Sequence, residues 1–292
     1  MSRLLLPMPD NGDFAARLAA AGAFDLGPLE VRAFPDGERY VRIDADVGGR
    51  DVALVCTLAQ ADQHFLPLAF AADALRDLGA ASVTLVAPYL GYMRQDARFQ
   101  PGEAVTSRTF ARLLSSTFDG LLTVDPHLHR FTSLDELYSV PAQALPAAAE
   151  IGAWVAREAR DALVVGPDAE SAQWAGDIAD AAGVSFVVLQ KRRTGDRQVS
   201  IEVPDLGAYR GRSAVLVDDI ASSGRTLAAA AQGIINQGFG LPDVVVVHAL
   251  FAGDALETVR RVAHRVVSTD TVAHPTNAIG VAPLVARALG LP

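Results

Sequence analysis

The chain has 292 residues, of which half are hydrophobic and a fifth are charged, and its formal net charge is −9. This length allows two domains with a core each, and the composition is that of a packed globular protein rather than a disordered one. The acidic balance argues against nucleic acid or an anionic membrane as a partner bound through a broad basic surface. We therefore expect any phosphate group that the protein binds to be held locally.

The single cysteine, Cys56, excludes an intrachain disulfide, and it lies in an apolar run where a buried structural thiol is expected. The N-terminal residues MSRLLLPMPD contain only three leucines before a proline, too few for a signal peptide. No run of about 18 apolar residues that could span a membrane occurs in the sequence. The expectation is a soluble, cytoplasmic protein.

Short runs of β-branched residues and leucine alternate with alanine-rich stretches along the chain. Most runs are apolar on both faces, which is typical of parallel strands whose sheet is covered by helices. The fold class is therefore α/β. We expect strands at 52–57, 82–88, 121–125, 162–166, 185–189, 214–217, 244–249 and 262–268. The expected helices cover 67–78, 107–117, 142–159, 172–182, 225–237 and 254–259.

The two halves of the chain resemble each other loosely, because each contains strands that end in polar residues. Open α/β sheets bind ligands at the carboxyl ends of their strands, so these strand ends are where a site is expected. Residues 139–146, which include Pro141 and Pro146, are the predicted boundary region between the halves.

Two segments of the first half combine turn or aromatic residues with charge. In residues 34–42, FPDGERYVR, the Asp36-Gly37 pair followed by alternating polar and apolar residues predicts a β-hairpin. Residues 88–99, PYLGYMRQDARF, place Arg94 and Arg98 among aromatic residues after a strand, which suits stacking of a base and binding of a polyphosphate. The alternative for this second segment is a solvated loop.

A histidine and a basic cluster follow two other predicted strands. His127 follows strand 121–125, and on the residues alone it is best interpreted as a hydrogen-bonded loop residue. Lys191 and Arg193 follow strand 185–189 and precede the polar residues 194–197. On the residues alone they form a solvated basic turn.

The segment 214–227, AVLVDDIASSGRTL, predicts a site for ribose 5-phosphate. Small residues before a helix allow the backbone to approach an anion, and the amides of the first helical turn point at it. The carboxylates of Asp218 and Asp219 suit the vicinal hydroxyls of a sugar, which are hydrogen-bond donors. The alternative is an ordinary helix start with a serine N-cap. A Walker A loop is excluded, because no GKS or GKT follows and the acidic pair precedes the loop.

Taken together, these segments resemble the ribose-phosphate pyrophosphokinase family, also called PRPP synthetases, and their motif style is closest to the archaeal-type members. The family carries F-S-D-G-E and P-Y-x-x-Y-x-R-Q-D, which residues 34–38 and 88–96 resemble in the same order. Residues 100–107, QPGEAVTS, resemble the family's stretch before its next helix. Further along, residues 123–129 resemble the family's D-x-H metal segment, and residues 166–168 resemble its S-P-D or A-P-D segment. Residues 191–193 resemble the K-x-R catalytic loop of the family. Residues 214–227 resemble the PRPP-binding motif of type I phosphoribosyltransferases.

The resemblance implies two tandem phosphoribosyltransferase-like domains, an ATP-site domain at 1–143 and a ribose-5-phosphate domain at 144–292. It implies transfer of the β,γ-diphosphoryl group of ATP to the C1 hydroxyl of ribose 5-phosphate, giving PRPP and AMP. Catalysis would fall to Lys191 and Arg193, and Mg²⁺ binding to His127 and Asp168. The residues implied for ATP are Phe34, Asp36, Glu38, Arg94, Gln95, Asp96 and, more weakly, His129. Those implied for ribose 5-phosphate are Asp218, Asp219, Ser222, Ser223, Gly224, Arg225 and Thr226.

The resemblance also implies a homo-oligomer, at least a dimer, because in the family the loop carrying Asp36 and Glu38 reaches the ATP site of a neighbouring subunit. Three residues depart from the family pattern: Pro35 replaces a serine, Glu170 comes after Ala169 where the family has a small residue, usually glycine, and Arg225 stands where glycine is usual. Gly-Arg-Thr is common in the transferases, so a PRPP-consuming phosphoribosyltransferase is one alternative, although it would leave the first half without a purpose. The other alternative is a non-catalytic, synthetase-like regulatory subunit.

Overall fold

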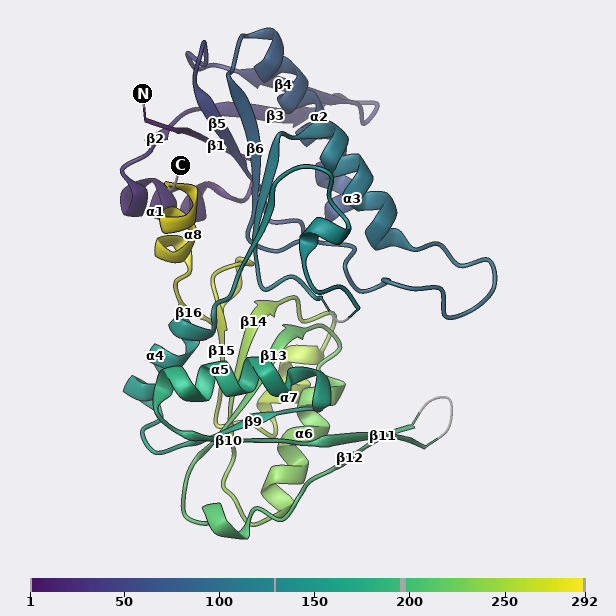
Figure 1. The fold of residues 1–292 in the computed structure, drawn as a ribbon, viewed down its shortest axis with the longest axis vertical. Helices are drawn as coiled ribbons and strands as arrows, with labels where there is room; N and C mark the ends of the chain where they lie inside the picture. Colours follow the sequence, from purple (N-terminus) through teal and green to yellow (C-terminus); the bar gives the residue numbers. More distant parts are fainter. Residues whose placement is uncertain (1, 129, 195–197, 291–292) are drawn as a thin grey trace. The chain divides into compact units, whose positions relative to one another are not determined.

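The computed structural model in Figure 1 describes residues 2–128, 130–194 and 198–290, with the backbone alone for 191–194 and 198–200. These residues group into two compact units, Met1–Leu145 with Ala282–Pro292, and Pro146–Val281. Each unit is an α/β sheet flanked by helices, which confirms the predicted fold class. No helix within the described ranges reaches the length and apolarity needed to cross a membrane.

The first unit contains a six-stranded parallel sheet in the order β2-β1-β5-β6-β7-β8. Its strands are β1 Leu4–Pro7, β2 Asp25–Leu26, β5 Asp51–Val55, β6 Ser82–Ala87, β7 Gly120–Val124 and β8 Ala142–Leu145. Its helices are α1 Gly12–Gly22, α2 Ala61–Asp77, α3 Thr106–Thr117, the 3₁₀ turn Leu134–Glu136 and α8 Ala282–Leu289. A separate antiparallel hairpin joins β3 Leu29–Ala33 to β4 Arg39–Ile43.

The second unit contains another six-stranded parallel sheet, in the order β10-β9-β13-β14-β15-β16. Its strands are β9 Leu163–Gly166, β10 Ser185–Val188, β13 Ala214–Ala221, β14 Asp243–Ala249, β15 Arg265–Thr269 and β16 Asn277–Ile279. Its helices are α4 Ala148–Glu158, α5 Ala172–Ala182, α6 Arg225–Asn236, α7 Ala255–Arg260 and two 3₁₀ turns, Ala169–Ser171 and Gly207–Tyr209. A hairpin joins β11 Gln190–Thr194 to β12 Gln198–Glu202.

The two units repeat one topology. When the parallel strands of each sheet are numbered along the chain, both sheets have the order 2-1-3-4-5-6. In both units the separate hairpin lies between the second and the third of these strands. The loose likeness of the two halves of the sequence therefore reflects the same chain path followed twice.

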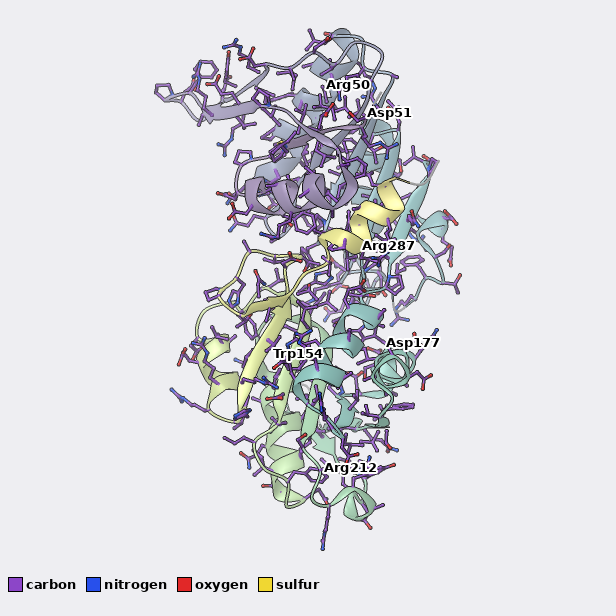
Figure 2. All side chains as sticks on the ribbon, turned by 90° about the vertical axis from the view of Figure 1, so that its left-hand side faces the viewer. Arg50, Asp51, Trp154, Asp177, Arg212 and Arg287 are labelled. Atoms are coloured by element: carbon purple, nitrogen blue, oxygen red, sulfur yellow. The ribbon has the colours of Figure 1, made fainter. Side chains whose placement is uncertain are left out.

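Buried strands account for the apolar runs. All seven residues of β14 are buried, and so are the last four of β5, which end beside the buried Cys56. Burial raises the pKa of the Cys56 thiol to about 12, as expected for a structural cysteine. At the amino end of the second sheet, the Arg265 guanidinium lies over the ring of Trp154 on α4, and Trp154 is labelled in Figure 2. Arg265 also donates a hydrogen bond to the Asp243 carboxylate at 2.9 Å.

Two predicted helices differ from the observed ones. Residues 142–145 form β8 rather than the start of a helix, because a residue before proline favours extended backbone and Pro146 follows Leu145. Helix α2 begins at Ala61 instead of residue 67. Its buried positions Ala61, Leu68 and Leu75 recur every seven residues, so packing outweighs the hydrogen bond lost at Pro67.

The last helix, α8, packs in the first unit, whereas the expected domain limits placed it with the second half. It lies beside α1 and buries Val285 and Leu289, and Arg3 donates to the carbonyl oxygen of Leu289 at 2.7 Å. In the second unit, α4 packs on α5, the helix that follows the first strand of that sheet, as α1 follows β1. Helix α8 therefore packs on α1 in the first unit as α4 packs on α5 in the second unit.

We predict that Leu289→Ala destabilises the protein by about 2–4 kcal/mol, because it leaves a cavity between α8 and α1. Leu78→Ala is the matched control, since Leu78 is 52% exposed in the same unit, and its effect should stay within about 0.5 kcal/mol. Urea unfolding followed by circular dichroism measures both. Equal effects of the two changes would contradict the role given to α8.

Candidate functional site

The polar segments of the second unit follow strands that are neighbours in its sheet. Strands β9 and β13 pair in parallel, so their carboxyl ends lie at the same edge. Asp168 comes two residues after β9 ends, and Asp218 and Asp219 lie in the second half of β13. The sequence placed these three carboxylates after separate strands, and the sheet brings them to one edge.

Strand β13 is longer than the predicted 214–217 and includes the acidic pair. Its pairing with β14 includes Asp218, Ile220 and Ala221, so the acidic pair lies within the strand rather than on a loop. Both residues are half-buried, and the Asp218 carboxylate accepts the N–H of Asp219 at 3.1 Å. This backbone limits the positions that the two carboxylates can take.

The predicted phosphate loop, residues 222–226 and below called the phosphate loop, passes close to α7 at Gly224. Gly224 has a φ of +68°, and a Cβ there would lie 2.9 Å from the carbonyl oxygen of Ala255. It is the N-cap of α6, with no side-chain cap, so the alternative of a serine N-cap is wrong. Arg225 and Thr226 open α6, where the first amides lack partners within the helix and can face an anion.

Asp168 is the N-cap of a short 3₁₀ turn that contains Glu170. Its carboxylate accepts the N–H of Glu170 at 3.2 Å, and its carbonyl oxygen accepts the hydroxyl of Ser171 at 2.6 Å. The Glu170 side chain, a departure from the family pattern, is exposed. This residue therefore uses its backbone to orient Asp168.

The basic residues of the second unit lie on a hairpin rather than in a turn. Lys191 and Arg193 belong to β11, where they pair in register with Ile201 and Val199 of β12. Their side chains and residues 195–197 lie outside the described part of the structure. Strand β12 packs beside α6, the helix that carries the phosphate loop.

In the first unit, the predicted hairpin is confirmed, and residues 34–38 form its turn. Gly37 has a φ of +95°, and the carboxylate of Asp36 accepts the N–H of Glu38 at 3.2 Å. The exposed ring of Phe34 packs edge-on against Tyr40, and the Arg32 guanidinium lies 4.8 Å from the Phe34 ring centre. The turn therefore presents an aromatic ring and two acids to the outside of the unit.

The other candidate ATP residues follow β6, next to the loop that follows β7. Arg94 is exposed and Gln95 is half-buried, but Asp96 is buried. The Asp96 carboxylate accepts Nε of Arg130 at 3.2 Å, which joins the two loops. Nothing in the sequence pattern indicated Arg130. His127 is half-buried on the second loop, and His129 lies outside the described residues.

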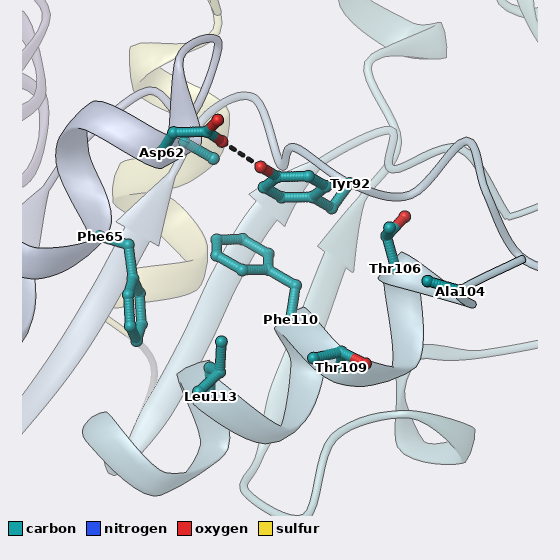
Figure 3. A pocket seen from close by; sticks show the side chains of 9 residues that line it. Asp62, Phe65, Tyr92, Ala104, Thr106, Thr109, Phe110 and Leu113 are labelled. Carbon is teal, nitrogen blue, oxygen red and sulfur yellow. Dashed lines mark hydrogen bonds between the residues drawn. The ribbon is translucent and has the colours of Figure 1, made fainter.

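An apolar cavity of about 330 Å³, shown in Figure 3, lies beside this region between α2 and α3. Phe65, Tyr92 and Phe110 line it, and the Tyr92 hydroxyl donates to the Asp62 carboxylate. This hydrogen bond raises the pKa of Tyr92. The sequence analysis missed Asp62 and Phe65, whose only signal is a three-residue spacing on a helix.

The described residues include no group of three or more His, Cys, Asp or Glu side chains arranged to hold a metal ion. Mg²⁺ usually takes one or two protein carboxylates and completes its shell with water and substrate phosphates. Asp168 lies at the carboxyl edge of the sheet, beside the strand that leads into the phosphate loop. A single carboxylate in this position fits Mg²⁺ binding of that kind.

Residues 4–117 match the N-terminal domain of ribose phosphate pyrophosphokinase, and residues 134–285 match the phosphoribosyl transferase domain. The chain is 35% identical over 289 residues to the ribose-phosphate pyrophosphokinase of Methanopyrus kandleri, and the match covers 98% of each chain. It is 33% identical to that of Halobacterium salinarum, covering 98% of this chain and 100% of the other.

The crystal structure of phosphoribosylpyrophosphate synthetase from Mycobacterium smegmatis shares the fold, with a TM-score of 0.85 and 23% sequence identity. That match covers 99% of this chain and 98% of the other. The two domain matches follow one another along most of the sequence, and the curated relatives match it nearly from end to end. This chain belongs to the ribose-phosphate pyrophosphokinase family.

Proposed function

We propose that the chain catalyses the reaction for which its family is named, transfer of the β,γ-diphosphoryl group of ATP to ribose 5-phosphate. The observation that carries this proposal is the pairing, in one chain, of the acidic strand end and phosphate loop with a complete first unit of the synthetase type. The C1 hydroxyl oxygen attacks the β-phosphorus, the bond from this phosphorus to the α-phosphate oxygen breaks, and AMP leaves. The products are PRPP and AMP.

The second unit binds the acceptor sugar in this proposal. Asp218 and Asp219 accept hydrogen bonds from the ribose hydroxyls, and the loop amides with the hydroxyls of Ser222, Ser223 and Thr226 hold the 5-phosphate. This arrangement fixes the C1 hydroxyl before the attack, and such positioning supplies a large part of the acceleration in phosphoryl transfer. The position of the half-buried acids within a strand of the sheet supports it, since the strand limits where their backbone can lie.

The first unit binds ATP in this proposal. Phe34 stacks on the adenine, and Asp36, Glu38, Arg94 and Gln95 bind the remaining polar groups of the nucleotide. Asp96 is buried and paired with Arg130, so its part is to hold the loop of Arg94 and not to contact ATP. His129 stays a weaker candidate from the sequence alone.

Mg²⁺ is the metal that we propose, with Asp168 of the second unit and His127 of the first unit as separate candidates for holding it. When bound, it neutralises charge on the phosphate oxygens. The N–H of Glu170 orients the Asp168 carboxylate for this role. Lys191 and Arg193, on the hairpin of the second unit, stabilise the charge that spreads over the transferring group.

The alternative of a PRPP-consuming transferase rests on Gly224, Arg225 and Thr226. It would use one unit of this kind, whereas the first unit here matches the N-terminal domain of the synthetases. The alternative of a regulatory subunit keeps the fold but not the chemistry. One assay distinguishes all three.

We expect purified protein to convert ATP and ribose 5-phosphate to AMP and PRPP in equal amounts when Mg²⁺ is present. Chromatography of the nucleotides, with PRPP measured by a coupled assay, follows both products, and EDTA should stop their formation. Folded protein that binds ATP but forms neither product would favour a regulatory subunit. Consumption of PRPP with a nucleobase would favour a transferase.

Replacing Lys191 with alanine should lower kcat by at least ~10²-fold while ATP binding persists, because the cation acts on the transferring group. Arg192→Ala is the matched control from the same strand and should keep most of the turnover. Steady-state kinetics and calorimetric ATP titration measure the two effects. Loss of ATP binding in Lys191→Ala would instead assign Lys191 to the nucleotide site.

We also propose that the protein is a homo-oligomer, at least a dimer, and acts in the cytoplasm. Leu66 and Phe70 of α2 are 56% and 46% exposed, and a shallow pocket joins them to Gly37, Glu38 and Arg39 at the hairpin. Large exposed apolar side chains in one place are typical of an interaction surface. We propose that a second copy covers this surface, next to the hairpin turn that carries Asp36 and Glu38.

Phe70→Glu should therefore weaken self-association by about tenfold or more, because it buries a charge in the contact. Phe186→Glu, which changes an exposed ring of the second unit, is the control and should leave the mass unchanged. Sedimentation equilibrium at several protein concentrations measures both variants. An unchanged mass in Phe70→Glu would exclude this surface.

A further inference from the structure

Main-chain hydrogen bonds tie the start of the phosphate loop to the segment that follows β14. The N–H groups of Leu250 and Phe251 both donate to the carbonyl oxygen of Ala221, at 3.0 and 2.8 Å. The N–H of Ala252 donates to the carbonyl oxygen of Ser222 at 2.9 Å. The conformation of residues 250–252 therefore sets where the phosphate loop leaves β13.

Phe251, at the centre of this segment, has an unfavourable backbone conformation. Its φ is +32°, in the left-handed region that bulky side chains rarely adopt. Such a residue keeps its conformation only where the surrounding structure holds it. Its side chain is buried, so what packs on the ring determines whether the backbone stays in place.

The ring that stacks on Phe251 belongs to His274. The two ring centres are 5.2 Å apart and the ring planes differ by 29°. His274 lies in the segment between β15 and β16, far along the chain from the phosphate loop. The stack therefore connects the segment between β15 and β16 to residues 250–252, whose backbone bonds the phosphate loop.

A chain of hydrogen bonds fixes the orientation of the imidazole. The Asn277 amide donates to the Ser268 hydroxyl at 2.9 Å, the Ser268 and Thr276 hydroxyls lie 2.7 Å apart, and Thr276 Oγ1 lies 2.7 Å from Nδ1 of His274. The N–H of Thr276 also donates to Nδ1, at 3.3 Å. Nδ1 thus accepts and the proton of the neutral ring lies on Nε2, which agrees with burial lowering the pKa of His274.

We infer that His274 is a positioning residue for ribose 5-phosphate: its ring holds Phe251 in the left-handed conformation, and Phe251 anchors the phosphate loop. This inference rests on the proposed function of that loop. Without the imidazole, residue 251 relaxes toward ordinary backbone angles, and its N–H and that of Ala252 turn away from the loop. Affinity for the sugar phosphate falls, whereas the ATP residues of the first unit keep their contacts.

The experiment compares ribose 5-phosphate binding by calorimetry, and KM for both substrates, in the wild-type protein and three variants. His274→Ala should weaken ribose 5-phosphate binding about tenfold and leave KM for ATP within about twofold. His274→Phe keeps a ring on Phe251 and should recover most of the affinity. His264→Ala is the control, because that exposed histidine contacts Asp243 at the amino end of the sheet.

The outcomes separate this inference from the proposed function. A wild-type protein that does not bind ribose 5-phosphate overturns both. Normal binding by His274→Ala, or an equal rise in KM for both substrates, overturns the positioning role alone. If His274→Ala does not fold, Thr276→Val decides, because without the hydroxyl beside Nδ1 the imidazole can turn out of the stack. Unchanged ribose 5-phosphate affinity in Thr276→Val then overturns the inference, and a selective loss supports it.

Discussion

Parallel pairing of the strands is the constraint on which both candidate sites depend. Strands that run the same way must each be followed by a crossover, and their carboxyl ends then meet at one edge of the sheet. In the second unit this brings Asp168 and the acidic pair of β13 to one edge. In the first unit it places the loops after β6 and β7 close enough for Asp96 and Arg130 to pair at 3.2 Å. The registers of these strand pairs set where the residues that follow each strand begin.

One topology supports two different sites because only the loops differ. In the second unit the third parallel strand ends with an acidic pair and is followed by a small-residue loop. In the first unit the third parallel strand is followed by residues 56–60, which contain no carboxylate and begin with the buried Cys56. The hairpins also lie at the same place in both units, yet one presents Phe34, Asp36 and Glu38 in its turn and the other carries Lys191 and Arg193 in a strand. The candidate residues of the two units therefore differ although the two sheets share one topology.

The sequence was sufficient for the α/β class, for most strands and for the helix start after Gly224, because apolar runs and small residues before a helix are local patterns. It was insufficient where a distant contact decides the structure. Residues 142–145 look helical but pair with β7, and Asp96 looks like a ligand group but is buried against Arg130. The stack of Phe251 on His274 joins residues from different loops, and neither residue carries a local signal of it. Lys191 and Arg193 were recognised only through their motif, since three basic residues in succession lack the alternation of a strand.

The position of α8 also determines the order in which the chain can fold during synthesis. The first unit is assembled from Met1–Leu145 and Ala282–Pro292, so the whole second unit is inserted between its parts. While the ribosome makes residues 146–281, α1 lacks the packing of α8, the helix that buries Val285 and Leu289. The second unit is continuous in sequence and can form before then. The nascent chain therefore exposes an apolar helix face until α8 has been made, and this is the period in which a chaperone would have a surface to bind.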